Sequence, residues 1–112
     1  MSDIQEITKF ILEFRNARNW EQFHQPKDLA VALSIEAAEL NELFLWKNPE
    51  EVKTVNRERV AEELADVLVY AFFLAEKYQF DVKEIIMQKM VKNALKYPVE
   101  KSRNLATKYT EL

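Results

Sequence analysis

Residues 60–75 of this chain, VAEELADVLVYAFFLA, carry the pattern that decides its fold. In a helix, the apolar side chains of this stretch lie nearly all the way round, which indicates burial on several sides. The stretch forms the middle of a predicted long helix over roughly 57–78. A single small chain offers too little surface to cover such a helix, so we expect a homo-oligomer.

The segments before this helix are helical as well, because their apolar residues recur at helical spacing. A first helix is expected over 3–18 and a loop over 19–25. A second helix begins at Pro26, since proline suits the first helical turn, and runs to about Trp46. The leucines of this helix that are expected to face the core are Leu29, Leu33, Leu40 and Leu43.

Capping signals place the remaining elements. Residues 48–51, NPEE, combine an N-cap, a proline and acids in the first turn, which predicts a short helix before the long one. Asp81 and Glu84 have capping-box spacing and open a last helix, which Pro98 should end. The polar segment 99–112 is expected to be an extended tail.

Composition favours one all-α domain of four to five helices over residues 1–112. Hydrophobic residues make up 48% of the chain and charged residues 31%, the balance of a folded globular protein. The absence of glycine excludes a Walker-type phosphate loop and a GxGxxG turn. Because cysteine is absent and His24 is the only histidine, a thiolate metal site, an HExxH site and a carboxylate-bridged di-iron bundle are excluded too. For His24, local packing and a functional role remain open.

No signal peptide or membrane span is expected. Asp3, Gln5 and Glu6 interrupt the start of the chain, and the longest apolar run, 67–75, is too short to cross a bilayer. The net charge of −3 argues against a general nucleic-acid binder. We therefore expect a soluble cytoplasmic protein with neither nucleic acid nor membrane as a partner.

Charged residues are segregated along the chain. Residues 28–46 contain four acids and no lysine or arginine, and the same is true of 60–76. Residues 83–108 are mainly basic, so an anionic substrate has a natural counterpart there. A solvated basic face is the alternative explanation for this last segment.

Two acidic pairs stand out within the acidic segments. Glu36 and Glu39 are three residues apart, as are Glu63 and Asp66, so each pair shares one face of its helix beside core leucines. Glu63 has a single cation at helical spacing, Arg59, and the other three acids have none, so the carboxylates repel one another and have raised pKa values. A Mg²⁺ ion would neutralise them, because it prefers carboxylate and phosphate oxygens. The alternative is again a solvated acidic face.

Aromatic and polar residues suggest where a nucleotide could bind. Trp20, in the predicted loop, offers a surface on which a base can stack, and Trp46 lies one turn beyond Glu42. Lys89, Asn93 and Tyr97, four residues apart, place a cation, an amide and a phenol along one helical edge. Core packing explains most of the other aromatic residues.

These features together resemble the MazG-like all-α nucleotide pyrophosphohydrolases, and among them the dCTP pyrophosphatase branch. Glu36-x-x-Glu39 followed by Glu63-x-x-Asp66 is similar to the metal-binding signature of that family. Five further blocks spread over most of the chain carry the resemblance: NWEQFHQPKDLAVAL (19–33), FLWK (44–47), EELADVLVY (62–70), KMVKNALKYPV (89–99) and KYTEL (108–112).

The resemblance implies a MazG-like bundle, assembled as a dimer or tetramer, that hydrolyses nucleoside triphosphates such as dCTP to the monophosphate and pyrophosphate. It implies Mg²⁺ held by four ligands, Glu36, Glu39, Glu63 and Asp66. Either Glu36 or Glu39 would take the proton of the attacking water.

The resemblance also implies residues for the nucleotide. Those implied around the base and sugar are Trp20, Trp46, Tyr70 and Asn93. Those implied at the phosphates are Lys89 and Tyr97, with Lys96 and Arg103 as further candidates. One position departs from the pattern: vertebrate dCTP pyrophosphatases have a histidine against the cytosine where this chain has Ile11, so a strict preference for cytosine is not implied.

Two other functions remain open on the sequence. The first is a non-enzymatic helical module whose acidic faces bind basic proteins, and the position of the acids among leucines disfavours it. The second is a dUTPase of the related all-α superfamily, which also cleaves between the α- and β-phosphates.

Overall fold

The computed structural model describes all residues, 1–112, and contains helices but no strand, which confirms the all-α prediction. Four helices are long, and two consist of four residues each. In chain order the elements are α1 (Asp3–Ala17), η1 (Glu21–Phe23), α2 (Pro26–Glu42), α3 (Pro49–Val52), α4 (Arg57–Lys77), α5 (Val82–Lys96), α6 (Val99–Ser102) and η2 (Tyr109–Glu111). None of these helices combines the length and the apolar character that a membrane span requires.

The chain divides into two compact units, Met1–Gln79 and Phe80–Leu112. The first unit contains α1 to α4, and the second contains α5, α6 and η2. The sequence-based expectation that 1–112 acts as one domain stays a prediction.

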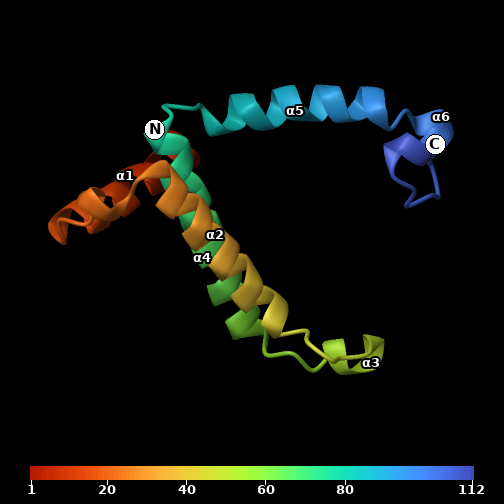
Figure 1. The fold of residues 1–112 in the computed structure, drawn as a ribbon, viewed down its shortest axis with the longest axis horizontal. Helices are drawn as coiled ribbons and strands as arrows, with labels where there is room; N and C mark the ends of the chain where they lie inside the picture. Colours follow the sequence, from red (N-terminus) through yellow and green to blue (C-terminus); the bar gives the residue numbers. More distant parts are fainter. The chain divides into compact units, whose positions relative to one another are not determined.

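The first unit is built on α2 and α4, which lie side by side (Figure 1). Leu29, near the start of α2, forms a core with Phe73, near the end of α4, so the two helices run antiparallel. Ile11 of α1 completes this core, and partly buried side chains from α1 and α4 surround it. Leu29 is the most deeply buried of the three, with 1% of its surface exposed.

Local signals, a proline for α2 and polar side-chain caps for α3 and α5, start these helices where the sequence places them. Pro26 is the first residue of α2, and the side chain of Asn48 accepts a hydrogen bond from the Glu51 amide at the start of α3. Asp81 accepts a hydrogen bond from the Glu84 amide at the start of α5, at 2.9 Å. These local interactions explain why the predicted helix starts agree with the structure.

The end of α2 differs from the prediction. The helix ends at Glu42 rather than near Trp46, and tighter turns follow, in which the amides of residues 43–45 and 47 donate hydrogen bonds three residues back. Trp46 then adopts a left-handed conformation, with φ of 62°. Such a residue usually ends a helix and is usually glycine, which this chain lacks. The sequence therefore gave no signal for this turn.

The prediction of an extended tail over 99–112 is wrong, because this segment contains α6 and η2. Pro98 ends α5 as expected, and its fixed φ then allows a new helical turn to begin directly after it. Tyr109 lies against Tyr97, with 5.9 Å between the ring centroids, and beneath the Lys96 ammonium. These contacts hold η2 against the end of α5.

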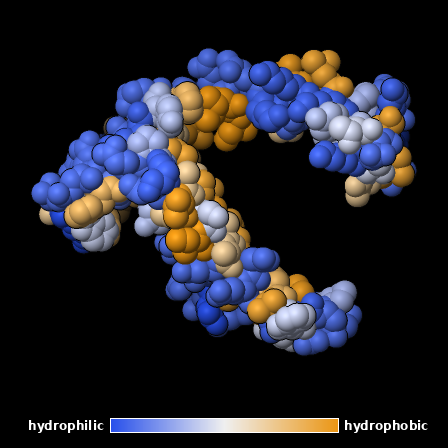
Figure 2. Space-filling view, viewed as in Figure 1, coloured by the Kyte–Doolittle hydropathy of each residue, from blue (hydrophilic) through white to orange (hydrophobic).

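Much apolar surface remains exposed, including patches over α2, α4 and α5 (Figure 2). Among the leucines expected to face the core, Leu29 of α2 and Leu43 directly after it are buried, whereas Leu33 and Leu40 are half-buried. On α4, Leu64 and Leu68 are 45% and 47% exposed, so they are not core residues within one chain. The predicted need of α4 for more cover than one chain supplies agrees with this exposure.

Candidate metal centre

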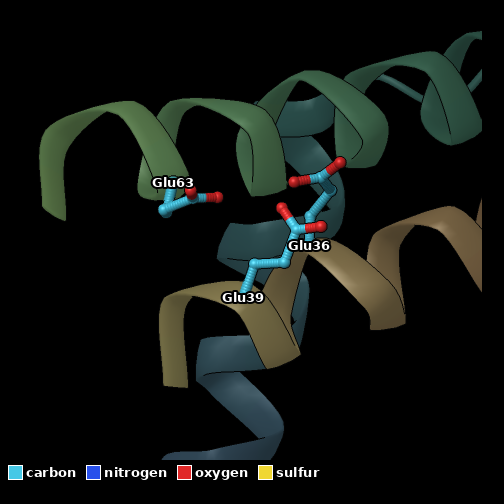
Figure 3. A group of neighbouring side chains, drawn as sticks. All are labelled: Glu36, Glu39 and Glu63. Carbon is cyan, nitrogen blue, oxygen red and sulfur yellow. The ribbon is translucent and has the colours of Figure 1, made fainter. Parts of the chain in front are cut away.

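The carboxylates of Glu36, Glu39 and Glu63 face one another in the space between α2 and α4 (Figure 3). One ligand oxygen of each lies within 4.8 Å of the others. Glu36 and Glu39 share a face because they are one helical turn apart, and the antiparallel contact places Glu63 opposite them. Three carboxylates at this spacing could hold a divalent metal ion.

Asp66, the fourth predicted ligand, lies one turn beyond Glu63 on α4. Its charge raises the pKa of both Glu36 and Glu63, so its carboxylate is close to the same cluster. It is more exposed than Glu36 and Glu63 and lies outside the group of three. Its role as a ligand stays a prediction.

The cluster is electrostatically costly without a cation. Burial, then a hydrogen bond with Glu39, then the charges of Glu39, Asp66 and Glu63 raise the pKa of Glu36 to about 7. Burial and the neighbouring carboxylates also raise the pKa of Glu63, and the charge of Arg59 opposes this effect. Like charges that share a desolvated site favour the protonated acid unless a cation is present.

Two oxygen atoms of the cluster test whether a metal ion fits. Oε2 of Glu36 and Oε2 of Glu63 are buried and have no hydrogen-bond partner in the protein. Buried polar atoms are nearly always satisfied, so unpaired carboxylate oxygens here indicate a missing partner. The donor set consists only of carboxylates, which suits a hard cation such as Mg²⁺.

Tyr70 lies beside the cluster, one turn beyond Asp66 on α4. Burial raises the pKa of its phenol, and the charges of Glu36, Asp66 and Glu39 raise it further. Its ring meets Phe73 edge to face at a centroid distance of 6.2 Å. The phenol is thus held at the border between the core and the carboxylates.

The two tryptophans lie at opposite ends of α2, whose 17 residues span about 26 Å. Trp20 is 44% exposed and meets Phe14 edge to face at 5.8 Å, while the Arg18 guanidinium lies over the Phe14 ring. Trp46 is 91% exposed. The structure therefore does not bring these two side chains together within one chain.

The other predicted nucleotide contacts belong to the second unit. Lys89, Asn93 and Lys96 lie on α5, Tyr97 follows its last residue, and Arg103 follows α6. The Asn93 amide lies 3.7 Å from Sδ of Met90. The roles of these five residues stay predictions.

His24 lies apart from the carboxylates, in the core of the first unit. It is buried, and its ring meets Phe73 at a centroid distance of 4.8 Å. Burial, with the charges of Arg15 and Lys77, lowers the pKa of its imidazole. The structure thus favours local packing among the two explanations left open for this residue.

Sequence reasoning missed an open pocket of about 520 Å³ beside the carboxylates. Glu39 and Glu63 line it together with Lys47 and Arg59. The sequence does show Arg59 one helical turn before Glu63, but this spacing alone does not indicate a pocket. Lys47 had no such signal, because it is separated from the carboxylates by the unpredicted turn at the end of α2.

Comparisons with known proteins agree with the resemblance. A model of the MazG-like family matches residues 31–112. The dCTP pyrophosphatase 1 of Rattus norvegicus is 41% identical over 97% of this chain and 67% of its own length, and that of Homo sapiens is 42% identical over the same shares. The crystal structure of a pyrophosphatase from Archaeoglobus fulgidus DSM 4304 superposes with a TM-score of 0.83, at 40% identity, over 88% of this chain and 94% of that one.

The cluster predicts how stability depends on pH in metal-free buffer. The folded-state pKa of Glu36 is about 7, above its ordinary value of 4.5, so folding favours its protonated form. Its contribution to stability is therefore fully present below about pH 4.5 and is lost as the pH rises through about 7. In thermal melts with a chelator, Glu36→Gln should melt above the wild type at pH 8, and this difference should shrink towards pH 4.5. A difference that does not change with pH would contradict the assigned cause.

Proposed function

The chain belongs to the MazG-like family, on its dCTP pyrophosphatase branch, and from this premise we propose how it acts. It is a nucleotide pyrophosphohydrolase. Our proposal is that it uses Mg²⁺ to convert a deoxynucleoside triphosphate such as dCTP to the monophosphate and pyrophosphate. The observation that carries the proposal is the cluster of Glu36, Glu39 and Glu63 with two unpaired buried oxygens.

The residues of the cluster suit hydrolysis at the α-phosphorus. Mg²⁺ held by Glu36, Glu39, Glu63 and Asp66 would supply charge neutralisation for the triphosphate and acidify the attacking water. Glu36 and Glu39 are the proposed acceptors of the water's proton, because they lie on one face at the centre of the cluster.

The nucleoside is proposed to lie towards Tyr70, whose phenol has its pKa raised by burial and by the charges of Glu36, Asp66 and Glu39. Trp20 and Trp46 are proposed to stack on the base, Asn93 to reach the base or sugar, and Lys89 and Tyr97 to hold phosphates, with Lys96 and Arg103 as further candidates. Exposed aromatic rings suit stacking, and both tryptophans are exposed.

The choice of base is the open part of this proposal, with a dUTPase-like preference as the second candidate. Ile11, at the position where the vertebrate branch has a histidine, is buried with Leu29 and Phe73. The first helix therefore offers no imidazole to cytosine at this position. Relative turnover across a panel of dNTPs and NTPs distinguishes dCTP preference from dUTP preference.

The products and the position of attack test the reaction. In ¹⁸O-labelled water with Mg²⁺, we expect a monophosphate that carries one ¹⁸O atom and unlabelled pyrophosphate, since attack occurs at the α-phosphorus. Mass spectrometry of the separated products measures the label. Label in the pyrophosphate, or orthophosphate released stepwise through a diphosphate, would contradict the assigned bond.

Removal of single carboxylates tests the metal ligands. Glu39→Gln and Glu63→Gln should each lower kcat by about 10²-fold or more, because each removes a ligand, while the fold stays intact. Glu62→Gln is the matched control, since this exposed acid neighbours Glu63 in sequence but is not part of the cluster. Mg²⁺ should raise the melting temperature of the wild type and of the control, and less that of the ligand variants. Near-normal turnover in both ligand variants would rule out this site.

We further propose a homodimer that pairs into a tetramer. Half-exposed Leu64 and Leu68 on α4 need cover, and Trp20 and Trp46 are too far apart to clasp one base within a chain. Light scattering at micromolar concentration should show a multiple of the 13.3 kDa chain mass.

If bases are clasped across subunits, mixing inactive Trp46→Ala and Glu39→Ala proteins should restore part of the activity after subunit exchange. A stable monomer would contradict the assembly, and verified exchange without recovered activity would contradict the shared site.

A further inference from the structure

The open pocket beside the carboxylate cluster lies where α2 ends and α4 begins. Glu39 and Glu63 belong both to the cluster and to the wall of the pocket. Further along the wall, Thr54 and Asn56 come from the segment that leads into α4, and Arg59 comes from the first turn of that helix. The pocket is therefore continuous with the candidate metal centre.

Two cations of the pocket wall, Lys47 and Arg59, have no partner of their own. Neither side chain makes an ion pair or a hydrogen bond within the chain, although the charge of Arg59 reaches Glu63. The nearby Lys53, by contrast, forms an ion pair with Glu50 at 3.3 Å. The positive end of the α4 dipole, capped by Asn56, adds to the positive potential on this side.

The order of side chains along α4 makes the two ends of the site chemically different. Arg59, Glu63, Asp66 and Tyr70 follow one another at intervals of four, three and four residues, so all lie along one face of the helix. A cation therefore precedes the two carboxylates, and a phenol follows them. The charges of Asp66 and of the α2 carboxylates reach Tyr70, which places it directly beside the cluster.

A nucleoside triphosphate also has two different ends, a nucleoside and a chain of phosphates. The bond that breaks joins the nucleoside monophosphate to the β- and γ-phosphates, so these two halves must lie on opposite sides of the reacting centre. With the nucleoside towards Tyr70, as the proposed function has it, the other half lies towards Arg59. Resting on that proposed function, we propose that the pocket binds the β- and γ-phosphates, and then the released pyrophosphate, through Lys47 and Arg59.

The chemistry of the step agrees with cations in this place. Water adds to the α-phosphorus, the bond to the bridging oxygen breaks, and the electron pair of that bond leaves with the pyrophosphate. Negative charge therefore grows on the leaving group in the transition state, where fixed cations stabilise it most. Lys47 and Arg59 are binding residues for the leaving group in this account.

Anion binding here should depend on a divalent cation. Three acids, Glu39, Glu42 and Glu63, line the pocket beside the two bases, so the wall carries a net negative charge on its own. A divalent ion on the carboxylates reverses that sign. Pyrophosphate should therefore bind with Mg²⁺ and weakly with a chelator.

Isothermal titration calorimetry of the full-length protein in saturating Mg²⁺ provides the test, with pyrophosphate and dCMP titrated separately. Lys47→Gln and Arg59→Gln should each raise the Kd of pyrophosphate about tenfold, the loss of one charge-assisted contact, and leave the Kd of dCMP within twofold. Arg59→Lys should recover part of the affinity. Arg57→Gln and Lys53→Gln are the matched controls, because these cations are neighbours in sequence but do not line the pocket.

The possible results distinguish the anion pocket from an indirect role of Arg59 and from a failure of the proposed function. Unchanged pyrophosphate affinity in both variants, or no pyrophosphate binding by the wild type, overturns it. Equal losses for pyrophosphate and dCMP also overturn it, since Arg59 would then act only through Glu63 and the metal ion. A wild type that binds pyrophosphate at this pocket but cleaves no nucleoside triphosphate would refute the proposed function and leave the anion pocket standing.

Discussion

The antiparallel contact between α2 and α4 is the interaction on which the rest of the first unit depends. Leu29 and Glu36 of α2, and Leu43 directly after its last residue, recur every seven residues, and the backbone stays helical at Leu43, so the three lie on one face. Leu29 and Leu43 are buried, at 1% and 9% exposure, so the seam that buries them also holds Glu36 between them. Burial of a carboxylate is thus a direct consequence of the hydrophobic contact, and the opposite helix brings Glu63 to the same place.

In this arrangement the carboxylates of the candidate metal centre lower the folding stability that the buried leucines supply. Burying leucines at both ends of the seam stabilises the helix pair, whereas gathering carboxylates at its centre opposes folding at neutral pH. A divalent ion turns the repulsion into shared coordination, so folding and metal binding favour the same helix pairing. The raised pKa of Glu36 and the unpaired oxygens of Glu36 and Glu63 have one physical origin, which is a set of acids without a cation.

Local signals made most of the helix starts and the acidic cluster predictable. Pro26, Asn48 and Asp81 act within a few residues of their own positions, and the spacing of Glu36 and Glu39 fixes their shared face. The end of α2 and the fold of residues 99–112 were not predictable in this way. Both depend on a backbone conformation or a ring contact that residue type alone does not specify, such as the contact between Tyr97 and Tyr109. The pocket was missed for a related reason, since Lys47 and Arg59 come to line one pocket only because the chain turns between α2 and α4.

Trp46 has a backbone conformation that glycine usually adopts, in a chain that contains no glycine, and this conformation bears on its proposed function. Four residues of the chain have positive φ, and each follows a helix. Asn19 and Asn104 are residue types that accept this conformation readily, whereas a tryptophan in it costs roughly 1–2 kcal/mol. The ring of Trp46 is 91% exposed, so packing within the chain does not offset that cost. A strained backbone that presents a bare indole agrees with the proposed role of Trp46, which is to stack on the base of a nucleotide bound by a neighbouring subunit.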